Sequence, residues 1–148
     1  LKNSTFPSLA DAPFSRHSTH YHLLAHINEV AEAGLMLADF AYSHWPDEWT
    51  KKLDRQELLQ ILLLHDLDKY LLLSDESLER SIAHGTLSAM ILNDLGFDSR
   101  VIEAVASHSP SASLHLDDPA SMILHYCDLF SCDHIYMLVS RTPHYCMK

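Results

Sequence analysis

Residues 54–70 have the sequence DRQELLQILLLHDLDKY, in which a polar opening is followed by an apolar run and then by an adjacent histidine and aspartate. Asp54 and Glu57 have the spacing of a capping box, which predicts that a helix begins here and continues to His65. This predicted helix is apolar on nearly all sides, which favours a central place in the fold.

The segments before and after this helix also show helical patterns. From His17 to about Ser43, apolar residues recur at steps of three and four, and Trp45-Pro46 then ends the pattern because proline disfavours a helical residue before it. Three further helices are predicted from capping signals: one from Asp75 or Ser77 to Gly96, one from Asp98 to just before Ser109-Pro110, and one from Asp118-Pro119 to about Leu138.

No alternating strand pattern of useful length is present, so the expected fold class is all-α. The length of 148 residues is typical of one domain. We expect an irregular lead-in over residues 1–15 and a single domain over residues 16–148. The 3 glycines also disfavour a β-sandwich or barrel, which needs frequent turns.

The composition limits the classes of partner. The 20 acidic residues outnumber the 10 basic ones and give a formal net charge of -10, which disfavours binding to a nucleic-acid polymer. The apolar runs are far shorter than the roughly 20 residues that span a bilayer, so no membrane segment is expected. The 3 cysteines (Cys127, Cys132 and Cys146) have no CxxC spacing, which argues against a disulfide framework and favours a cytoplasmic location.

Several of the 12 histidines and two aspartates are candidates for chemistry. Asp66 follows an apolar helix, and Asp128 lies in the apolar segment ILHYCDLF; a carboxylate that is buried needs a cation or hydrogen bonds to offset its desolvation. The alternative for Asp66 is a helix C-terminus that becomes exposed at His65, and the alternative for Asp128 is an exposed face of an amphipathic helix. Three single histidines lie in other predicted helical segments, and each one alone is more typical of an ordinary core or surface residue: His26, His84 and His108.

The order of these residues, H…HD…H…H…D, resembles that of the HD-domain superfamily of metal-dependent phosphohydrolases, an all-α fold for which we expect a compact bundle of five to seven helices. The local sequences are similar too: HINEVAEA from residue 26, HDLDK from 65, HGTLSAMIL from 84, VIEAVASHS from 101 and HYCDLF from 125. The resemblance covers about residues 20–134. Asp68 departs from it, since glycine is usual there; its carboxylate either lies beside the site or faces solvent.

The resemblance implies a metal site formed by His26, His65, Asp66, His84, His108 and Asp128, with Asp66 bridging two ions. Four histidines and two carboxylates suit a divalent transition metal (Fe, Mn, Co, Ni or Zn) better than Mg or Ca. A metal-bound hydroxide would then attack phosphorus, and a nearby cation would hold the developing charge.

Five other residues could assist this chemistry. Lys69 is the strongest candidate for the cation, ahead of Arg80 and Arg100. His125 lies three residues before Asp128 and could orient it or act as an acid toward the leaving oxygen. His22, four residues before His26, is either on the same helix face as that residue or part of a surface histidine cluster.

The expected function is hydrolysis of a nucleotide or another small phosphoester, with a small phosphorylated molecule as the partner. Two alternatives stay open. Some relatives with the same six ligands hold a mixed-valent di-iron centre and act as oxygenases, and a non-catalytic ligand-sensing module would retain the metal without turnover. A homo-oligomer also remains open.

Overall fold

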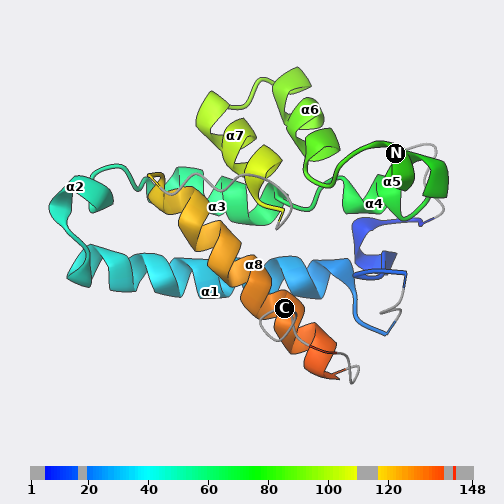
Figure 1. Cartoon of the computed structure of the whole chain (residues 1–148), viewed down its shortest axis with the longest axis horizontal. Helices are drawn as coiled ribbons and strands as arrows, with labels where there is room; N and C mark the ends of the chain where they lie inside the picture. Colours follow the sequence, from blue (N-terminus) through cyan, green and yellow to red (C-terminus); the bar gives the residue numbers. More distant parts are fainter. Residues whose placement is uncertain (1–5, 17–19, 110–116, 139–141, 143–148) are drawn as a thin grey trace.

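The computed structural model describes residues 6–16, 20–109, 117–138 and 142, without the side chains of residues 79 and 80. Cys146 and the side chain of Arg80 therefore lie outside the described part of the protein. Within it, helices predominate (Figure 1), in this order: η1 (Leu9–Asp11), α1 (Leu23–His44), α2 (Asp47–Thr50), α3 (Arg55–Leu64), α4 (Lys69–Leu72), α5 (Glu76–Ser81), α6 (Thr86–Asp94), α7 (Ser99–Ser107) and α8 (Pro119–Leu138).

The predicted all-α class is confirmed. Six of the helices in the described segments have six or more residues, and two more, α2 and α4, are single turns of four. The one β feature there is an isolated bridge between Pro13 and His22. None of the described helices is both long and apolar enough to cross a bilayer.

Four helix starts follow the predicted capping signals, at Asp54, Asp75, Asp98 and Asp118. Asp54 accepts a hydrogen bond from the backbone N–H of Glu57, as a capping residue does, and α3 begins at the next residue. The carboxylate of Asp98 accepts from the N–H of Arg100 at the start of α7. Asp118 accepts from the N–H of Ser121 at 2.8 Å, and Pro119 is the first residue of α8.

Two predicted helix boundaries are wrong. The first helix begins at Leu23 rather than near His17, because His22 is extended and forms the bridge to Pro13. His22 is therefore an exposed residue before α1 and does not share a helix face with His26.

The helix predicted from Asp75 or Ser77 to Gly96 begins as expected after Asp75 but is in fact two helices, α5 and α6, separated by a turn at residues 82–85. Gly85 in this turn has φ +88°, which glycine adopts without the steric cost that other residues bear. A Cβ at this position would lie 2.8 Å from the carbonyl oxygen of Val105, so the turn also packs closely against α7.

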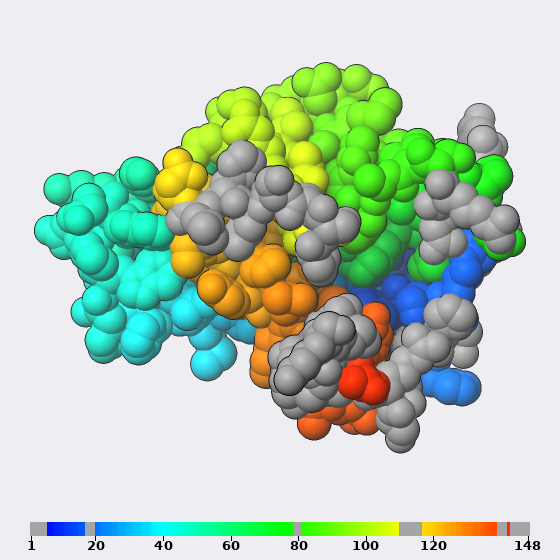
Figure 2. Space-filling model, viewed as in Figure 1, coloured from blue at the N-terminus to red at the C-terminus, as the bar shows by residue number. Residues whose placement is uncertain are grey.

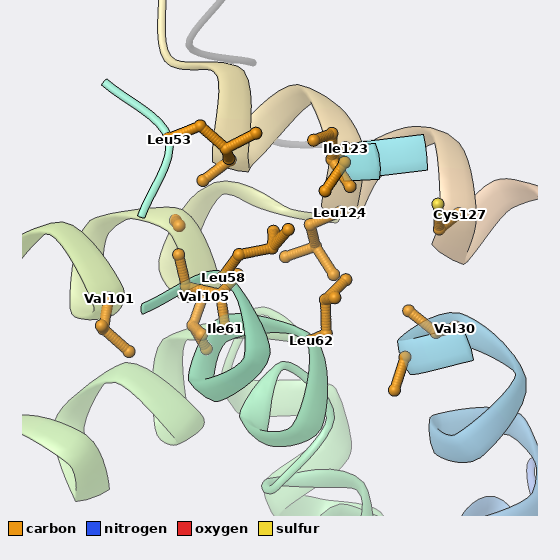
Figure 3. Close-up of a cluster of buried hydrophobic side chains, with 14 of the residues drawn as sticks. Val30, Leu53, Leu58, Ile61, Leu62, Val101, Val105, Ile123, Leu124 and Cys127 are labelled. Carbon is orange, nitrogen blue, oxygen red and sulfur yellow. The ribbon is translucent and has the colours of Figure 1, made fainter. Parts of the chain in front are cut away.

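The core lies where α1, α3, α7 and α8 meet (Figure 3). Helix α8 crosses the long helix α1, and α6 and α7 form a pair beside α3 (Figure 1). In the space-filling view, α8 crosses the middle of the visible face below α7 (Figure 2). Fully buried residues such as Leu58, Leu62 and Leu124 each contribute about 1.5–3 kcal/mol to stability through removal of their side chains from water.

The close packing of α1 on α3 places the predicted ligands near one another. Gly34 in α1 allows this approach, because a Cβ there would lie 2.5 Å from Cδ1 of Leu62. Residue 65 follows α3 directly, so the contact between these helices brings the end of α3 to the N-terminal half of α1.

Candidate metal centre

The six predicted ligands come from different elements and converge at one place. His26 is in α1, His65 and His108 directly follow α3 and α7, and Asp128 is in α8. Asp66 lies in the turn before α4, and His84 lies in the turn before α6. All are buried except His84, whose side chain is 29% exposed. The alternatives, an exposed helix end at His65 and an exposed helix face at Asp128, are wrong, because His65, Asp66 and Asp128 are buried.

The two carboxylate oxygens of Asp66 face different histidines. Oδ2 lies 3.2 Å from Nε2 of His26 and 3.4 Å from Nε2 of His65. Oδ1 lies 2.9 Å from Nε2 of His84 and 3.7 Å from Nε2 of His108. Asp66 therefore stands between two pairs of histidines, and Nε2 is the atom that each of the four presents to it.

Asp128 completes one side of this arrangement. Its Oδ1 lies 3.2 Å from Nε2 of His26 and 3.9 Å from Nε2 of His65. Burial raises the pKa of Asp128, but the hydrogen bond to His26 and the charge of His65 outweigh that effect, and the pKa lies well below its usual range. Asp128 is thus a second buried carboxylate that stays ionised.

Hydrogen bonds at Nδ1 determine which ring nitrogen of each histidine is free. Nδ1 of His65 lies 2.8 Å from the carbonyl oxygen of Leu62, and Nδ1 of His108 lies 2.6 Å from that of Val105. A carbonyl oxygen only accepts, so both Nδ1 atoms carry hydrogen, and Nε2 is the nitrogen left to bind an ion. These carbonyls belong to the last turns of α3 and α7, where main-chain acceptors lack helical partners.

His26 reaches the same state through a side chain. Its Nδ1 lies 2.9 Å from Oγ of Ser131, whose hydroxyl lies 2.5 Å from Oε2 of Glu29. The carboxylate of Glu29 can only accept, so the single hydroxyl hydrogen goes to it and Oγ accepts from Nδ1–H of His26. Hydrogen bonds of this kind orient metal-binding histidines in general.

The residues fit a divalent transition metal. Oδ1 of Asp66 is buried and has no partner in hydrogen-bond geometry among the described residues. The ligand atoms of His26, His65 and Asp66 all lie within 4.8 Å of one another. The same holds for the ligand atoms of Asp66, His84 and His108. Such spacings suit atoms that share an ion at bond lengths of about 2.0–2.2 Å. Imidazole and carboxylate ligands together are typical of Zn, Mn, Fe, Co or Ni.

Lys69 lies beside this cluster, as predicted for the cation. Its Nζ donates to Oδ2 of Asp66 at 2.6 Å and lies 4.2 Å from the ring centroid of Phe14. Burial lowers the pKa of Lys69, but the charges of Asp66 and Asp128 raise it by more, so the side chain is a permanent cation. Burial likewise raises the pKa of Asp66, and Lys69 and His65 hold it well below its usual range.

Two other predicted residues make different contacts. The ring of His125 is half-buried and contacts Tyr126 at 5.7 Å between ring centroids, and His125 is in none of the groups of ligand atoms found among the described residues. Arg100 makes ion pairs of 3.0 Å with both Glu57 and Asp118.

The sequence prediction missed residues that support the site. Ser131 and Cys132 follow Asp128 by three and four positions, so the helical period places them on its face. Sγ of Cys132 donates to Oδ1 of Asp128 at 3.4 Å, and Cys132 forms a third group with His26 and Asp128. The same spacing rule applied downstream of Asp128 would have found both. Glu29 follows His26 by three positions and could have been found in the same way.

Comparison with known families agrees with this geometry. The family model described as the HD domain matches residues 23–132. The chain belongs to the HD-domain family. No curated protein matches the chain, and no solved structure matches it. HD domains bind divalent metals and belong to a superfamily of metal-dependent hydrolases, and the buried histidine and aspartate cluster of this HD domain could hold such a metal.

Proposed function

We propose that this HD domain is a metal-dependent phosphohydrolase that acts on a nucleotide or another small phosphoester. The observation that carries the proposal is the position of Asp66 between two pairs of Nε2 atoms. A carboxylate with one oxygen toward each pair is suited to bridge two ions. We assign His26, His65 and Asp128 to one ion, His84 and His108 to the other, and Asp66 to both.

The protein would hold the ions with side chains that are already oriented and mostly buried. Bound divalent ions lower the pKa of water and polarise a phosphoryl oxygen. The imidazoles, fixed through their Nδ1 hydrogen bonds, would keep their Nε2 lone pairs directed inward without reorganisation. Asp66 and Asp128 would stay ionised and so offset the charge of the ions.

Lys69 supplies the charge that a phosphoryl group needs. A cavity of about 130 Å³ lies next to the cluster and is lined by Lys69 and His84 together with Phe14, Leu72 and Ile82. Its volume exceeds what a single water molecule requires, so it has room for a phosphoryl group. When ions bind Asp66, Nζ would turn from this carboxylate to the phosphoryl oxygens.

A second, larger cavity is less suited to the reaction. It has a volume of about 850 Å³, and Phe6, Leu9, Tyr70, Ile91 and Leu95 are among the residues that line it. None of the six ligands lines this cavity. The net charge of -10 further supports a small substrate over a nucleic-acid polymer.

The proposal is tested with protein purified without chelator. We expect hydrolysis of small phosphoesters in the presence of Mn²⁺, and loss of this activity in His65→Gln. Metal-dependent consumption of O₂ without phosphate release would favour the oxygenase instead. A thermal shift with nucleotides but no turnover of any phosphoester would indicate a sensing module.

A further inference from the structure

Asp68 is a buried carboxylate whose two oxygens contact one turn of the chain. It lies two residues after Asp66 and is fully buried. Of the two predictions for its carboxylate, a position beside the site and exposure to solvent, the second is therefore wrong. Oδ2 accepts a hydrogen bond from the N–H of Gly85 at 2.7 Å, and Oδ1 lies 3.0 Å from Nδ1 of His84. Its own N–H donates to Oγ of Ser88 at 2.8 Å.

These contacts join the turn that carries His84 to the segment that carries Asp66. His84 is outside the helices, whereas His26 is within one and His65 and His108 directly follow others. A loop residue depends more on side-chain contacts for its orientation than a helical one does. Asp68 makes two such contacts: its carboxylate accepts a hydrogen bond from the N–H of Gly85, and its backbone N–H donates one to Oγ of Ser88.

The position of Asp68 also decides which nitrogen of His84 carries hydrogen. Nε2 of His84 faces Oδ1 of Asp66, and Nδ1 faces Oδ1 of Asp68. Oδ1 of Asp68 is buried and has no partner in hydrogen-bond geometry among the described residues, and a carboxylate only accepts, so its position 3.0 Å from Nδ1 favours hydrogen on Nδ1 and leaves Nε2 as the ligand atom when an ion binds. Nδ1 of His65 and of His108 has a neutral carbonyl as its partner instead. A charged partner raises the basicity of the ring further.

We propose that Asp68 is a positioning residue that fixes the orientation and tautomer of His84 and thereby sets the affinity of the ion held by His84 and His108. This inference rests on the proposed pair of ions. It predicts a selective effect, because Asp68 contacts His84 and not His26 or His65 among the interactions of the described residues.

Asp68→Asn tests the inference with little change in volume. The side-chain oxygen of the introduced amide can still accept from Gly85, but its NH₂ group would donate to Nδ1 of His84 and favour the tautomer with hydrogen on Nε2. Equilibrium dialysis against Mn²⁺, followed by elemental analysis, measures the affinity for each ion. We expect one ion to bind with unchanged affinity and the other about 10–100-fold more weakly.

Asp75→Asn is the matched control, because the carboxylate of Asp75 caps α5 through the N–H groups of Ser77 and Leu78. It should retain both affinities. Equal affinities in wild type and Asp68→Asn would overturn the inference and leave the proposed function intact, and an equal loss of both ions would overturn it too. A wild-type protein that binds one ion would overturn both.

A measurement on the wild type does not depend on how the variant folds. Nitrogen NMR of the Zn²⁺-loaded protein, with histidine labelled, reports which nitrogen of His84 carries hydrogen. We expect hydrogen on Nδ1 and the metal on Nε2. Metal on Nδ1, or hydrogen absent from it, would overturn the inference.

Discussion

Nζ of Lys69 lies 2.6 Å from Oδ2 of Asp66, the oxygen that also faces His26 and His65. The lysine thus occupies a position next to the place where we expect an ion. In protein stripped of metal, its charge offsets that of the buried carboxylate. In loaded protein, the ions would take over this task and leave Lys69 available to a substrate.

Lys69→Met is therefore expected to separate metal binding from turnover. We predict that metal content stays at the wild-type level, since the competing cation is lost, while hydrolysis of a small phosphoester falls about 100-fold or more. Elemental analysis and initial rates measure the two effects. Lys51→Met, at an exposed position, is the charge-matched control. Loss of metal from Lys69→Met would show that the lysine supports the ligands instead.

The stability of metal-stripped protein should depend on His84. Burial lowers the pKa of His84, but its close contacts with the carboxylates of Asp66 and Asp68 raise it by more, to about 9. A raised pKa stabilises the fold fully below the ordinary value of 6.5, and this contribution is lost as pH rises through about 9. The shift corresponds to at most about 3.5 kcal/mol.

Urea unfolding in the presence of a chelator, at pH 6 and pH 9.5, measures this contribution. The difference in unfolding free energy between wild type and His84→Gln should shrink as pH rises. A difference that stays constant or grows over this interval would contradict the assignment.

The turn at Gly85 should be sensitive to a single methyl group. Gly85→Ala places Cβ 2.8 Å from the carbonyl oxygen of Val105 at a positive φ, whereas Gly96→Ala, also at positive φ, meets no atom within 4 Å. Both substitutions incur the conformational cost of about 1 kcal/mol, and Gly85→Ala adds a clash of about 1–3 kcal/mol. Chemical denaturation compares them. Equal losses of stability would show that the backbone around Gly85 shifts to accommodate the methyl group at little cost.

The Ser131 hydroxyl is predicted to support metal binding through His26. Ser131→Ala removes the acceptor for Nδ1–H of His26, so we expect metal affinity to fall about 10–100-fold. Ser107→Ala is the control, because the hydroxyl of Ser107 donates to the carbonyl of Glu103 in its own helix. Isothermal titration with Mn²⁺ provides the measurement. An unchanged metal affinity in Ser131→Ala would contradict a role for Ser131 and Glu29 in orienting His26.

Local signals in the sequence predicted most of the helices. The acceptors at Asp54, Asp98 and Asp118 act within three residues, so capping patterns reveal them without knowledge of the fold. The break between α5 and α6 was missed because it depends on distant contacts. Gly85 is held by Asp68, 17 residues earlier in the chain, and packs on Val105.

The candidate site was predictable to a similar degree. The order of the six ligands along the chain, with its resemblance to a family pattern, was enough to predict that they lie together. The partners of Asp68 lie 17 and 20 residues away, so its burial could not be inferred from its neighbours in sequence. Ser131 and Cys132 were within reach of the helical period, but nothing in the sequence shows which flank of Asp128 contacts the ligands.

The central claim is that Asp66 joins two ions, and metal content measures this most directly. Elemental analysis of wild type and Asp66→Ala, both purified without chelator and reloaded with Mn²⁺, is the decisive comparison. We predict two ions per chain in the wild type and loss of metal in Asp66→Ala. Two ions per chain in Asp66→Ala would contradict the assignment of the bridge.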